Sequence, residues 1–440
     1  MRSNAKYWYG IAVFMLAAMI IVLSGCDEQP ETKTVTITVQ MFEGPEYDAM
    51  VPTAAYWNEH YSAKTGITVK PTYLNRIGYF EKLHIQLIAG QSEPDIVHPF
   101  SLHLGQINKY LEPLDSYLSN PDLMKAPDGS ELDKDTVLSA AWKTVMVSDK
   151  KTYMVPVDMS EVILFYRKDL ITEPPQTWDD FINVARNFTQ SHNSNSPTPY
   201  GAIVQGKYEM WTFCAALETF WPFGSSLVDE GGKNLGFKGP ATKRAFQVFE
   251  TLTKDKILPP GAENAEYPQV AEAVKSGRVA MAIQWNAFYN ELIDPVRSPK
   301  VYDKFDIAPP PGVQNSDGSL SRSMYVQTIG LAVNRASKNK EAAMRFLTWA
   351  SLGEGALVYN KAGGSSPIKP VWEGPDAVMP YRKLAPWVEA FGRGPRNHPK
   401  LVDLMMSGAG WVQRVVMGDV NSAEASKEMQ REMTTIIRSR

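Results

Sequence analysis

Two histidines lie close enough in the sequence to suggest a metal site. His98 and His103 are five residues apart, where a short predicted strand turns into a helix, and neutral imidazole nitrogens are common zinc ligands. The other four histidines are scattered along the chain: His60, His84, His192 and His398. We therefore favour packed or solvent-exposed loop histidines over a metal centre, and expect no bound metal.

Motifs that would indicate catalysis are absent from the sequence. It contains no G-x-x-x-x-G-K-[ST] phosphate-binding loop, no H-E-x-x-H zinc motif and no G-x-S-x-G nucleophile turn. The 48 Asp and Glu residues include no pair that the sequence alone assigns to glycosidase chemistry. We therefore expect a binding protein with no catalytic residue and no cofactor, and keep a glycan-degrading enzyme as the alternative.

Cysteine content and charge narrow the class of protein further. The only two cysteines, Cys26 and Cys214, exclude a disulfide framework and a cysteine-rich zinc or iron–sulfur site. We expect Cys214 to be a small buried hydrophobic residue. The 45 Lys and Arg residues nearly balance the acidic ones, for a net charge of −3, which argues against a nucleic-acid partner. A chain of 440 residues, 44% of them apolar, predicts two or more globular lobes.

The first 26 residues are predicted to be a targeting segment. Arg2 and Lys6 precede an unbroken apolar run from Ile11 to Leu23, which has the length of a signal-peptide core and is short for a bilayer span of roughly 20 residues. Leu23-Ser24-Gly25-Cys26 resembles the bacterial lipoprotein signal, in which the cysteine is lipidated and becomes the new N-terminus. We predict a signal peptide over residues 1–25, lipidation of Cys26, and anchoring to the bacterial cell membrane on its outer side, periplasmic if the cell is Gram-negative. Plain secretion and a retained anchor helix are the alternatives.

The segments after residue 34 alternate between strand and helix patterns. Residues 26–34 are polar and form a linker. Five elements then follow in order: a strand from Val35 to Met41, a helix over residues 48–65, a strand from Ile67 to Tyr73, a helix from Tyr79 to Ala89, and a strand beginning at Pro94. This alternation is typical of an open, largely parallel α/β sheet.

Four segments, taken in order, resemble the extracellular solute-binding proteins of ABC importers, the maltose-binding-like family 1. The strongest match is Tyr153-Met154-Val155-Pro156 with residues 164–170 and 173–181, which is similar to the family pattern Tyr-Gly-Val-Pro, Tyr-Tyr-Asn-Lys-Asp-Leu and Pro-Pro-x-Thr-Trp-Asp-Glu. Met154 and Arg167 depart from that pattern. The other three segments span residues 87–118, 274–285 and 305–347.

This resemblance implies a fold and a function. The fold is α/β, of the periplasmic binding protein type II: two lobes, each a largely parallel sheet flanked by helices, joined by a multi-segment hinge with the ligand in the cleft between them. We expect the first lobe at residues 35–152 plus about 303–360 and the second at 153–302 plus about 361–440. Pro156 and Pro309-Pro310-Pro311 are candidate hinge positions. The implied function is capture of a carbohydrate or polyol by a monomer and its delivery to the permease subunits of an ABC importer; a sugar receptor for a signalling partner is the alternative.

Candidate ligand-binding residues follow from the resemblance. Sugar clefts need aromatic platforms for apolar ring faces and polar groups for hydroxyls, and the family places both on loops that leave the strands. Trp285, after a predicted strand from Val279 to Ile283, is the side chain that we most expect to stack on a sugar. The full set is Glu43, Phe100, Ser101, Asp158, Ser160, Tyr208, Trp211, Trp285, Asn286, Tyr325 and Ser365. Since the chain has 11 Trp, 19 Tyr and 17 Phe, core packing is the alternative for every aromatic residue.

Overall fold

The first five predicted elements are confirmed by the computed structural model, which describes residues 34–75, 78–147, 149–229, 234–237, 239–375, 377 and 379–439. They are β1 (Val35–Phe42), α2 (Pro45–His60) with α3 (Ser62–Thr65), β2 (Ile67–Leu74), α4 (Tyr79–Ile88) and β3 (Ile96–Val97). Gly66 ends α3 with a left-handed φ of 70°, a conformation that glycine adopts without steric cost. The predicted signal peptide and Cys26 lie outside the described residues.

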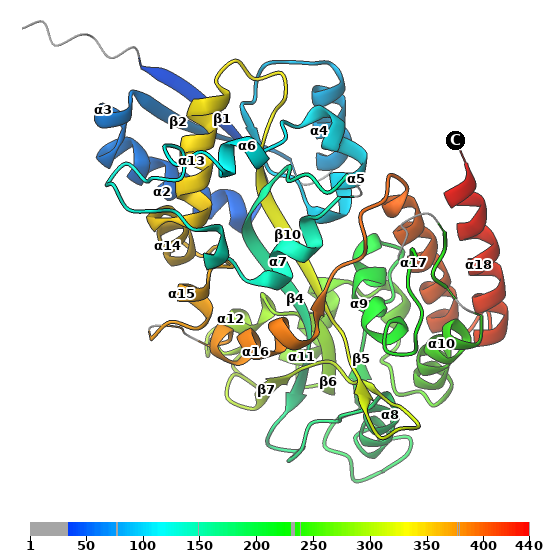
Figure 1. Ribbon diagram of the computed structural model, residues 1–440. Helices are drawn as coiled ribbons and strands as arrows, with labels where there is room; N and C mark the ends of the chain where they lie inside the picture. The colour runs from blue at the N-terminus through cyan, green and yellow to red at the C-terminus, as the bar shows by residue number, and fades with distance from the viewer. Residues whose placement is uncertain are drawn as a thin grey trace, which may run out of the picture.

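One mixed sheet of nine described strands runs through the molecule (Figure 1). Its order is β2-β1-β3-β10-β4-β6-β5, with β11 paired to β10 and β7 paired to β4. The further strands are β4 (Val155–Arg167), β5 (Tyr200–Ile203), β6 (Val279–Trp285), β7 (Phe305–Ala308), β10 (Met324–Val333) and β11 (Gly392–Arg393), while β8 (Val313–Gln314) and β9 (Leu320–Ser321) form a separate hairpin. The strands β1 to β3 form one end of this order, in the first lobe, and β5 and β6 form the other end, in the second lobe.

The long strands β4 and β10 make the sheet mixed rather than largely parallel. As expected, β1 is parallel to β2 and β3, and β5 to β6. However, β10 is antiparallel to β3 and β4, and β4 to β6 and β7, because the chain crosses between the lobes in one direction on β4 and returns on β10. The ladder between them shifts register near Pro156, which has no N–H to donate.

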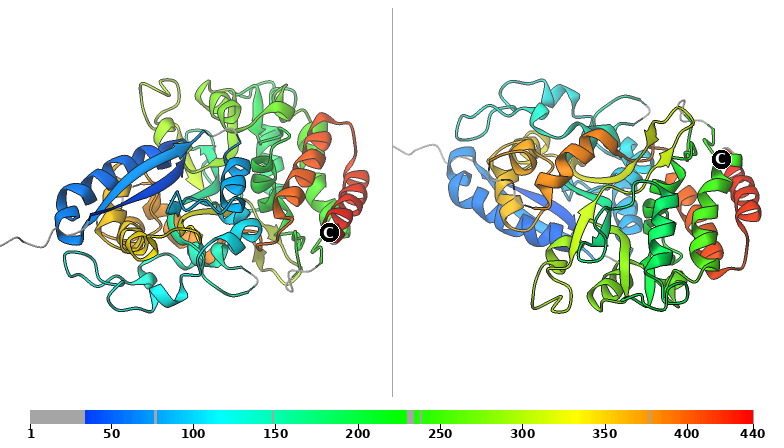
Figure 2. Two further views of the ribbon diagram at one scale, coloured as in Figure 1. Left: turned by 90° about the horizontal axis from the view of Figure 1, so that it is seen from above. Right: turned by 90° about the horizontal axis from the view of Figure 1, so that it is seen from below.

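One group of helices packs around the first-lobe part of the sheet and joins segments that are distant in the sequence. They are η1 (Ser101–His103), α5 (Leu104–Ile107), η2 (Asn108–Tyr110), α6 (Asp115–Leu118), η3 (Lys134–Thr136), α7 (Ser139–Val145), α13 (Lys340–Leu352), α14 (Glu354–Lys361) and α15 (Lys369–Trp372). In Figure 2, α13 and α14 lie beside α2. At this contact the Glu354 carboxylate, at the start of α14, accepts hydrogen bonds of 2.6 Å from the hydroxyls of Tyr56 on α2 and Tyr61 just after it.

The other helices lie mainly in the second lobe. They are α8 (Trp178–Asn187), α9 (Met210–Phe220), α10 (Gly239–Lys254), η4 (Ala262–Asn264), α11 (Tyr267–Lys275), α12 (Phe288–Leu292), α16 (Tyr381–Phe391), α17 (Leu401–Met417) and α18 (Ser422–Arg438). The C-terminal pair α17 and α18 packs on α9 and α10, as Figure 1 shows, whereas α16 contacts α7 and β10. The residue boundaries of the two lobes stay a prediction.

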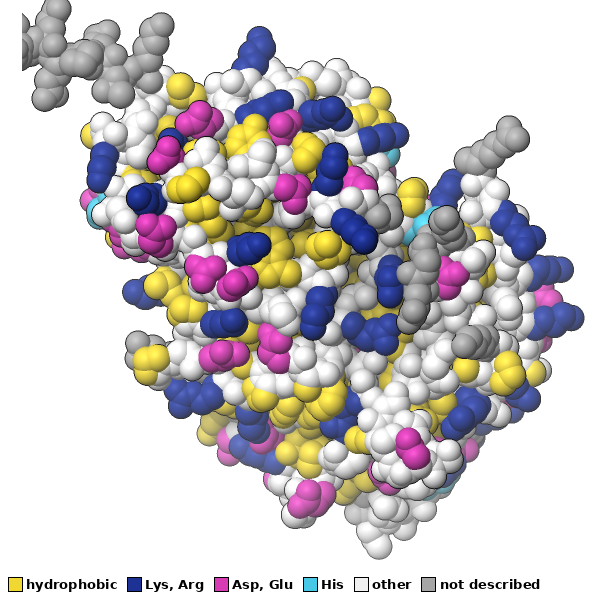
Figure 3. All heavy atoms as spheres, viewed as in Figure 1, with side chains coloured by type: hydrophobic (Ala, Val, Ile, Leu, Met, Phe, Trp, Pro, Cys, Tyr) yellow, Lys and Arg dark blue, Asp and Glu magenta, His cyan; other side chains and the backbone are white. Residues whose placement is uncertain are grey.

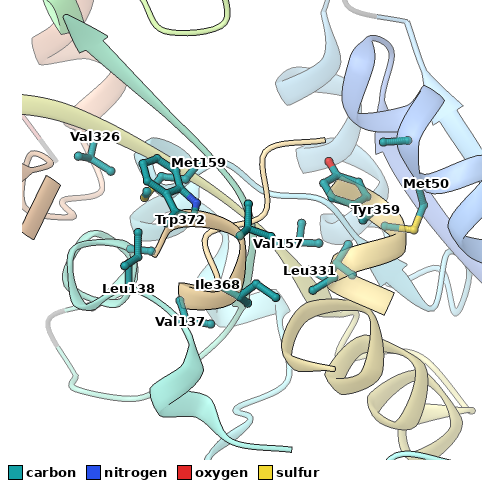
Figure 4. Packing of buried hydrophobic residues seen from close by; sticks show 14 of the residues in the cluster. Met50, Val137, Leu138, Val157, Met159, Val326, Leu331, Tyr359, Ile368 and Trp372 are labelled. Atoms are coloured by element: carbon teal, nitrogen blue, oxygen red, sulfur yellow. The ribbon is translucent and has the colours of Figure 1, made fainter. Parts of the chain in front are cut away.

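The crossing strands are buried on both faces. On one face Val157, Met159 and Val326 pack with Ile368 and Trp372 in the main hydrophobic cluster (Figure 4). On the opposite face of the sheet, the second lobe has a separate hydrophobic cluster that includes α9, α10, α17 and α18. Cys214 is fully buried in this cluster, as predicted. Because β4 and β10 are packed on both faces, their side chains have little freedom to move at the junction of the lobes.

The outer surface carries charges of both signs. On the face drawn in Figure 3, Lys and Arg side chains alternate with Asp and Glu over both lobes. Among the described residues, no helix combines the length and the apolar character that crossing a bilayer would require.

Candidate binding cleft

A cavity of about 440 Å³ opens where the two lobes meet the crossing strands. This volume lies within the range of roughly 300–1,000 Å³ that is usual for small-molecule sites. Side chains from the ends of β1, β3 and β6, from β4 and β10, and from the first turns of α2, α9 and α11 line it. They are Phe42, Pro45, Glu46, Phe100, Ser160, Trp211, Glu266, Tyr267, Pro268, Trp285, Ala287, Gln327 and Ile329.

The first-lobe wall of this cleft is an aromatic cluster. Phe100 lies 5.3 Å from Phe42 and 5.1 Å from Phe80 between ring centroids, both edge to face. Behind them, the imidazole of His103 stacks on Phe80 at 3.4 Å. Phe100 is buried and packs in the third hydrophobic cluster of the molecule, so this wall is held rigidly by its own core.

The second-lobe wall is built from two indoles. Trp211, on the first turn of α9, lies 5.9 Å from Phe100 across the cleft and 6.0 Å from Trp285, to which it is nearly perpendicular. Trp285 ends β6 and meets Tyr325 edge to face at 5.7 Å. Both tryptophans are only partly buried, whereas Tyr325 is fully buried and stacks on Trp221. Partly exposed indole faces of this kind suit the apolar faces of a ligand.

The cleft floor is formed by the crossing strands. Ser160 on β4 and Gln327 on β10 are directly opposite each other in the ladder, so their side chains share one face of the sheet. The Gln327 amide nitrogen donates to the hydroxyl of Ser101 at 2.8 Å, and its amide oxygen accepts from the hydroxyl of Tyr325 at 3.1 Å. The floor thus offers polar groups between two aromatic walls.

Two carboxylates lie at the rim of the cleft. Glu46 is on the first turn of α2, and Glu266 is the N-cap of α11, where its side chain and that of Gln269 form a capping box. Carboxylate oxygens accept hydrogen bonds from hydroxyl groups. The described lining therefore combines acceptors with aromatic surface.

Asp158 and Ser365 are joined to each other next to the cleft. The Asp158 carboxylate accepts from the Ser365 backbone N–H at 2.8 Å and from the Tyr359 hydroxyl at 3.0 Å. Burial, and then the charge of Glu46, raise the pKa of Asp158 to about 7. This arrangement fastens the turn after α14 to the crossing strand β4.

Asn286 also bonds to protein. Its backbone N–H donates to the carbonyl of Glu161 at 2.7 Å, and its side-chain oxygen accepts from the Glu161 N–H at 3.2 Å. The Glu161 side chain is fully buried, and burial raises its pKa well above the usual range. Asn286 therefore extends the β4–β6 pairing by one step.

The predicted ligand residues fall into three groups. Phe100, Ser160, Trp211 and Trp285 line the cavity together. Ser101, Asp158, Asn286, Tyr325 and Ser365 form a buried or half-buried layer that bonds to the protein instead. Glu43 and Tyr208 are exposed and do not line the cavity. Whether each of these residues contacts a ligand stays a prediction.

Sequence reasoning missed Glu46, Glu266 and Tyr267. Pro45 at the start of α2 was the available signal, because proline favours the first turn of a helix and so places Glu46, rather than Glu43, on a helical turn facing the cleft. Nothing in the local sequence around Glu266 and Tyr267 shows that α11 begins at the cleft.

His98 and His103 are packed rather than exposed. Both are buried in the first lobe, and burial lowers the pKa of each to about 3, so they stay neutral. Within the described part of the chain, no group of three or more His, Cys, Asp and Glu residues could hold a metal ion. The packed-loop interpretation of these histidines agrees with this placement.

Similar proteins support the assignment of the fold. Over its best 227 residues the chain is 26% identical to a putative binding protein of Brucella abortus (strain 2308), covering 50% of this chain and 52% of that protein. A mannitol-binding protein of Pseudomonas aeruginosa is 26% identical over 261 residues, or 57% of each chain. The chain thus spans about half the length of the curated relatives that it matches.

A solved structure covers nearly the whole chain. Maltose-bound MalE3 of T. maritima superposes with a TM-score of 0.74 at 20% identity, over 92% of this chain and all of that one, which confirms the type II binding-protein fold. The family model described as bacterial extracellular solute-binding protein matches residues 43–356, and this family binds solutes rather than converting them. The chain belongs to the bacterial extracellular solute-binding protein family.

Proposed function

We propose that this protein is an extracytoplasmic, membrane-tethered receptor that captures a carbohydrate or polyol between its two lobes and delivers it to an ABC importer. The observation that carries the proposal is the cleft itself. Aromatic walls from both lobes, Phe100 on one side and Trp211 and Trp285 on the other, face a polar floor of Ser160 and Gln327.

This combination fits a polyhydroxylated solute. The C–H faces of a sugar or polyol are apolar and lie against indole and phenyl rings, while its hydroxyls need hydrogen-bond partners at the edge. Glu46, Glu266, Ser160 and Gln327 supply such partners around the cavity. The mannitol-binding relative and the maltose-bound structural neighbour support the same class of solute.

The position of the cleft suits a carrier. A ligand held by both lobes favours the closed arrangement only by its difference in affinity for the closed and open forms. An importer could then distinguish the loaded shape from the empty one, which is what delivery to permease subunits requires.

A thermal-shift screen tests the solute class. Ligands that bind only the folded state raise its stability by RT ln(1 + [L]/Kd). The screen contains D-mannitol, ribitol, D-glucose and maltose, with an amino-acid mixture and inorganic phosphate as other classes. A rise in melting temperature with at least one sugar or polyol is expected. A rise only with amino acids or phosphate would contradict the proposed solute class, and conversion of the bound solute would favour the enzyme alternative.

The tether rests on Leu23-Ser24-Gly25-Cys26. Cys26→Ser should abolish lipid attachment and leave the protein unprocessed or soluble, while the matched Cys214→Ser variant should remain lipidated. Mass spectrometry of the membrane fraction measures both. Wild-type protein that reaches the membrane without lipid would refute the lipoprotein assignment.

A further inference from the structure

Gln327 is a polar residue of the cleft floor. It lies on β10 directly opposite Ser160 of β4, between the aromatic walls, and lines the cavity although only 2% of its surface is exposed. A ligand in the cavity therefore reaches only a small part of this side chain. What that part can offer to a ligand depends on the hydrogen bonds that the amide already makes.

Both hydrogens of the Gln327 amide are already used. Its nitrogen donates to the Ser101 hydroxyl at 2.8 Å and to the Thr328 carbonyl at 2.9 Å. The Tyr325 hydroxyl donates to the amide oxygen at 3.1 Å. Since an amide oxygen has two acceptor positions, one remains. Turning the amide by half a rotation would bring its oxygen against the Thr328 carbonyl, with two acceptors facing each other, so the network determines the orientation.

The groups behind Gln327 cannot easily rearrange. Tyr325 is fully buried, with its ring stacked on Trp221 and its edge contact to Trp285. Its backbone N–H donates to the buried carboxyl of Glu218 on α9 at 2.9 Å. Ser101 belongs to the first lobe and is 3% exposed. The orientation of one amide is thus held from both lobes at once.

We infer that Gln327 presents only a hydrogen-bond acceptor to the cleft, and that Tyr325 and Ser101 act as positioning residues that make the site select solutes with a donor at this point. This inference rests on the proposed function and adds specificity to it. A hydroxyl of a sugar or polyol meets the requirement. An ether, fluorine, carboxylate or phosphate oxygen placed there does not, because it would face another acceptor.

Fluorinated analogues provide the test, because replacing a hydroxyl with fluorine removes the donor and keeps a similar size. The probes are whichever of D-mannitol, ribitol, D-glucose and maltose binds in the screen, with its monodeoxy and monodeoxyfluoro analogues, and titration calorimetry measures the affinities. We expect one position at which the deoxy and fluoro analogues both bind about tenfold or more weakly than the parent. A fluoro analogue that keeps parent affinity at every position would overturn the inference without any variant protein.

Variants then assign that position to Gln327. In Gln327→Met, which keeps the side-chain length, the parent and its fluoro analogue should bind equally at that position. The matched control is Gln205→Met, since Gln205 is another buried glutamine, bonded to Gln284 and outside the cavity lining; it should keep the discrimination. The Ser101→Ala/Tyr325→Phe double variant should reduce the difference between parent and fluoro analogue, although neither altered side chain lines the cavity.

The failures are distinguishable. If no sugar or polyol in the screen binds, the proposed function and this inference fall together. If one binds and Gln327→Met keeps the discrimination of the wild type, only the inference is overturned. If the double variant keeps it while Gln327→Met loses it, the positioning role of Ser101 and Tyr325 is overturned.

Discussion

Removal of the Trp285 indole is the perturbation that most directly probes the cleft. Trp285 ends β6, lines the cavity and is partly exposed. It touches Trp211 and Tyr325 through nearly perpendicular ring contacts at 6.0 and 5.7 Å. Trp285→Ala therefore removes a ligand platform and two aromatic contacts, while the fully buried core of the lobe stays intact.

The substitution has one consequence for binding and one for stability. Loss of an aromatic platform at the centre of a binding site costs about 2–4 kcal/mol of binding, which is about thirtyfold to several hundredfold in Kd. Each ring contact is worth about 0.5–1.5 kcal/mol, so the loss of both should lower the free energy of unfolding by about 1–3 kcal/mol. The variant should therefore fold, have a melting temperature a few degrees lower than that of wild type, and bind its solute poorly.

Titration calorimetry with the best solute from the screen, together with thermal melts, measures both effects. Trp387→Ala is the matched control, because Trp387 is also a half-buried indole that packs on the main core, but it does not line the cavity. This variant should lose stability and keep affinity. Trp285→Ala with affinity within threefold of wild type, or with no recoverable folded protein, would refute the reasoning that Trp285 is a cleft wall.

Three other outcomes follow from the same structure. Gly364→Ala should lower the melting temperature strongly, because the new Cβ would lie 2.1 Å from the Tyr359 ring. The control Gly239→Ala should be tolerated, because its Cβ meets nothing closer than 3.8 Å. Equal melting temperatures of the two variants would contradict the prediction. Burial and the Glu46 charge raise the pKa of Asp158 to about 7 from an ordinary value of 3.8, so the unfolded chain loses the carboxyl proton of Asp158 at a lower pH than the folded protein does. Wild type should therefore lose stability relative to Asp158→Asn as the pH rises from 4 to 7, with no further change above pH 7. Denaturant melts at a series of pH values measure this difference, and a constant difference would refute the prediction. Solution scattering should give a smaller radius of gyration with solute than without it, and an unchanged profile with a verified ligand would argue against closure of the lobes.

Local patterns along the chain were enough to predict the first elements of the first lobe and to show the resemblance to the family. The period-two alternation in Val35–Met41 and the glycine after Thr65 depend only on neighbouring residues, and the structure has β1 and the end of α3 there. The positions of Phe100, Ser160 and Trp285 at the cavity were also accessible, because each follows or occupies a strand that the family resemblance places at the cleft. Trp211, on the first turn of α9, was a candidate without such a reason.

Tertiary structure alone decided which polar residues line the cavity and which lie behind it. Tyr325 and Gln327 alternate along β10, whereas Ser101 is more than two hundred residues away in the sequence. Only the packing of η1 on β10, with its bridge between Phe100 and Ile329, brings Ser101 to the Gln327 amide. Likewise, Asp158 and Ser365 are separated by more than two hundred residues, yet the Ser365 backbone N–H donates a hydrogen bond to the Asp158 carboxylate. Hydrogen-bond partners are chosen by three-dimensional proximity and by the cost of leaving a buried group unpaired, and neither quantity is written in local composition. The sequence therefore indicated that aromatic and polar groups would meet at one cleft, and the fold decided which of them line the cavity and which bond to the protein.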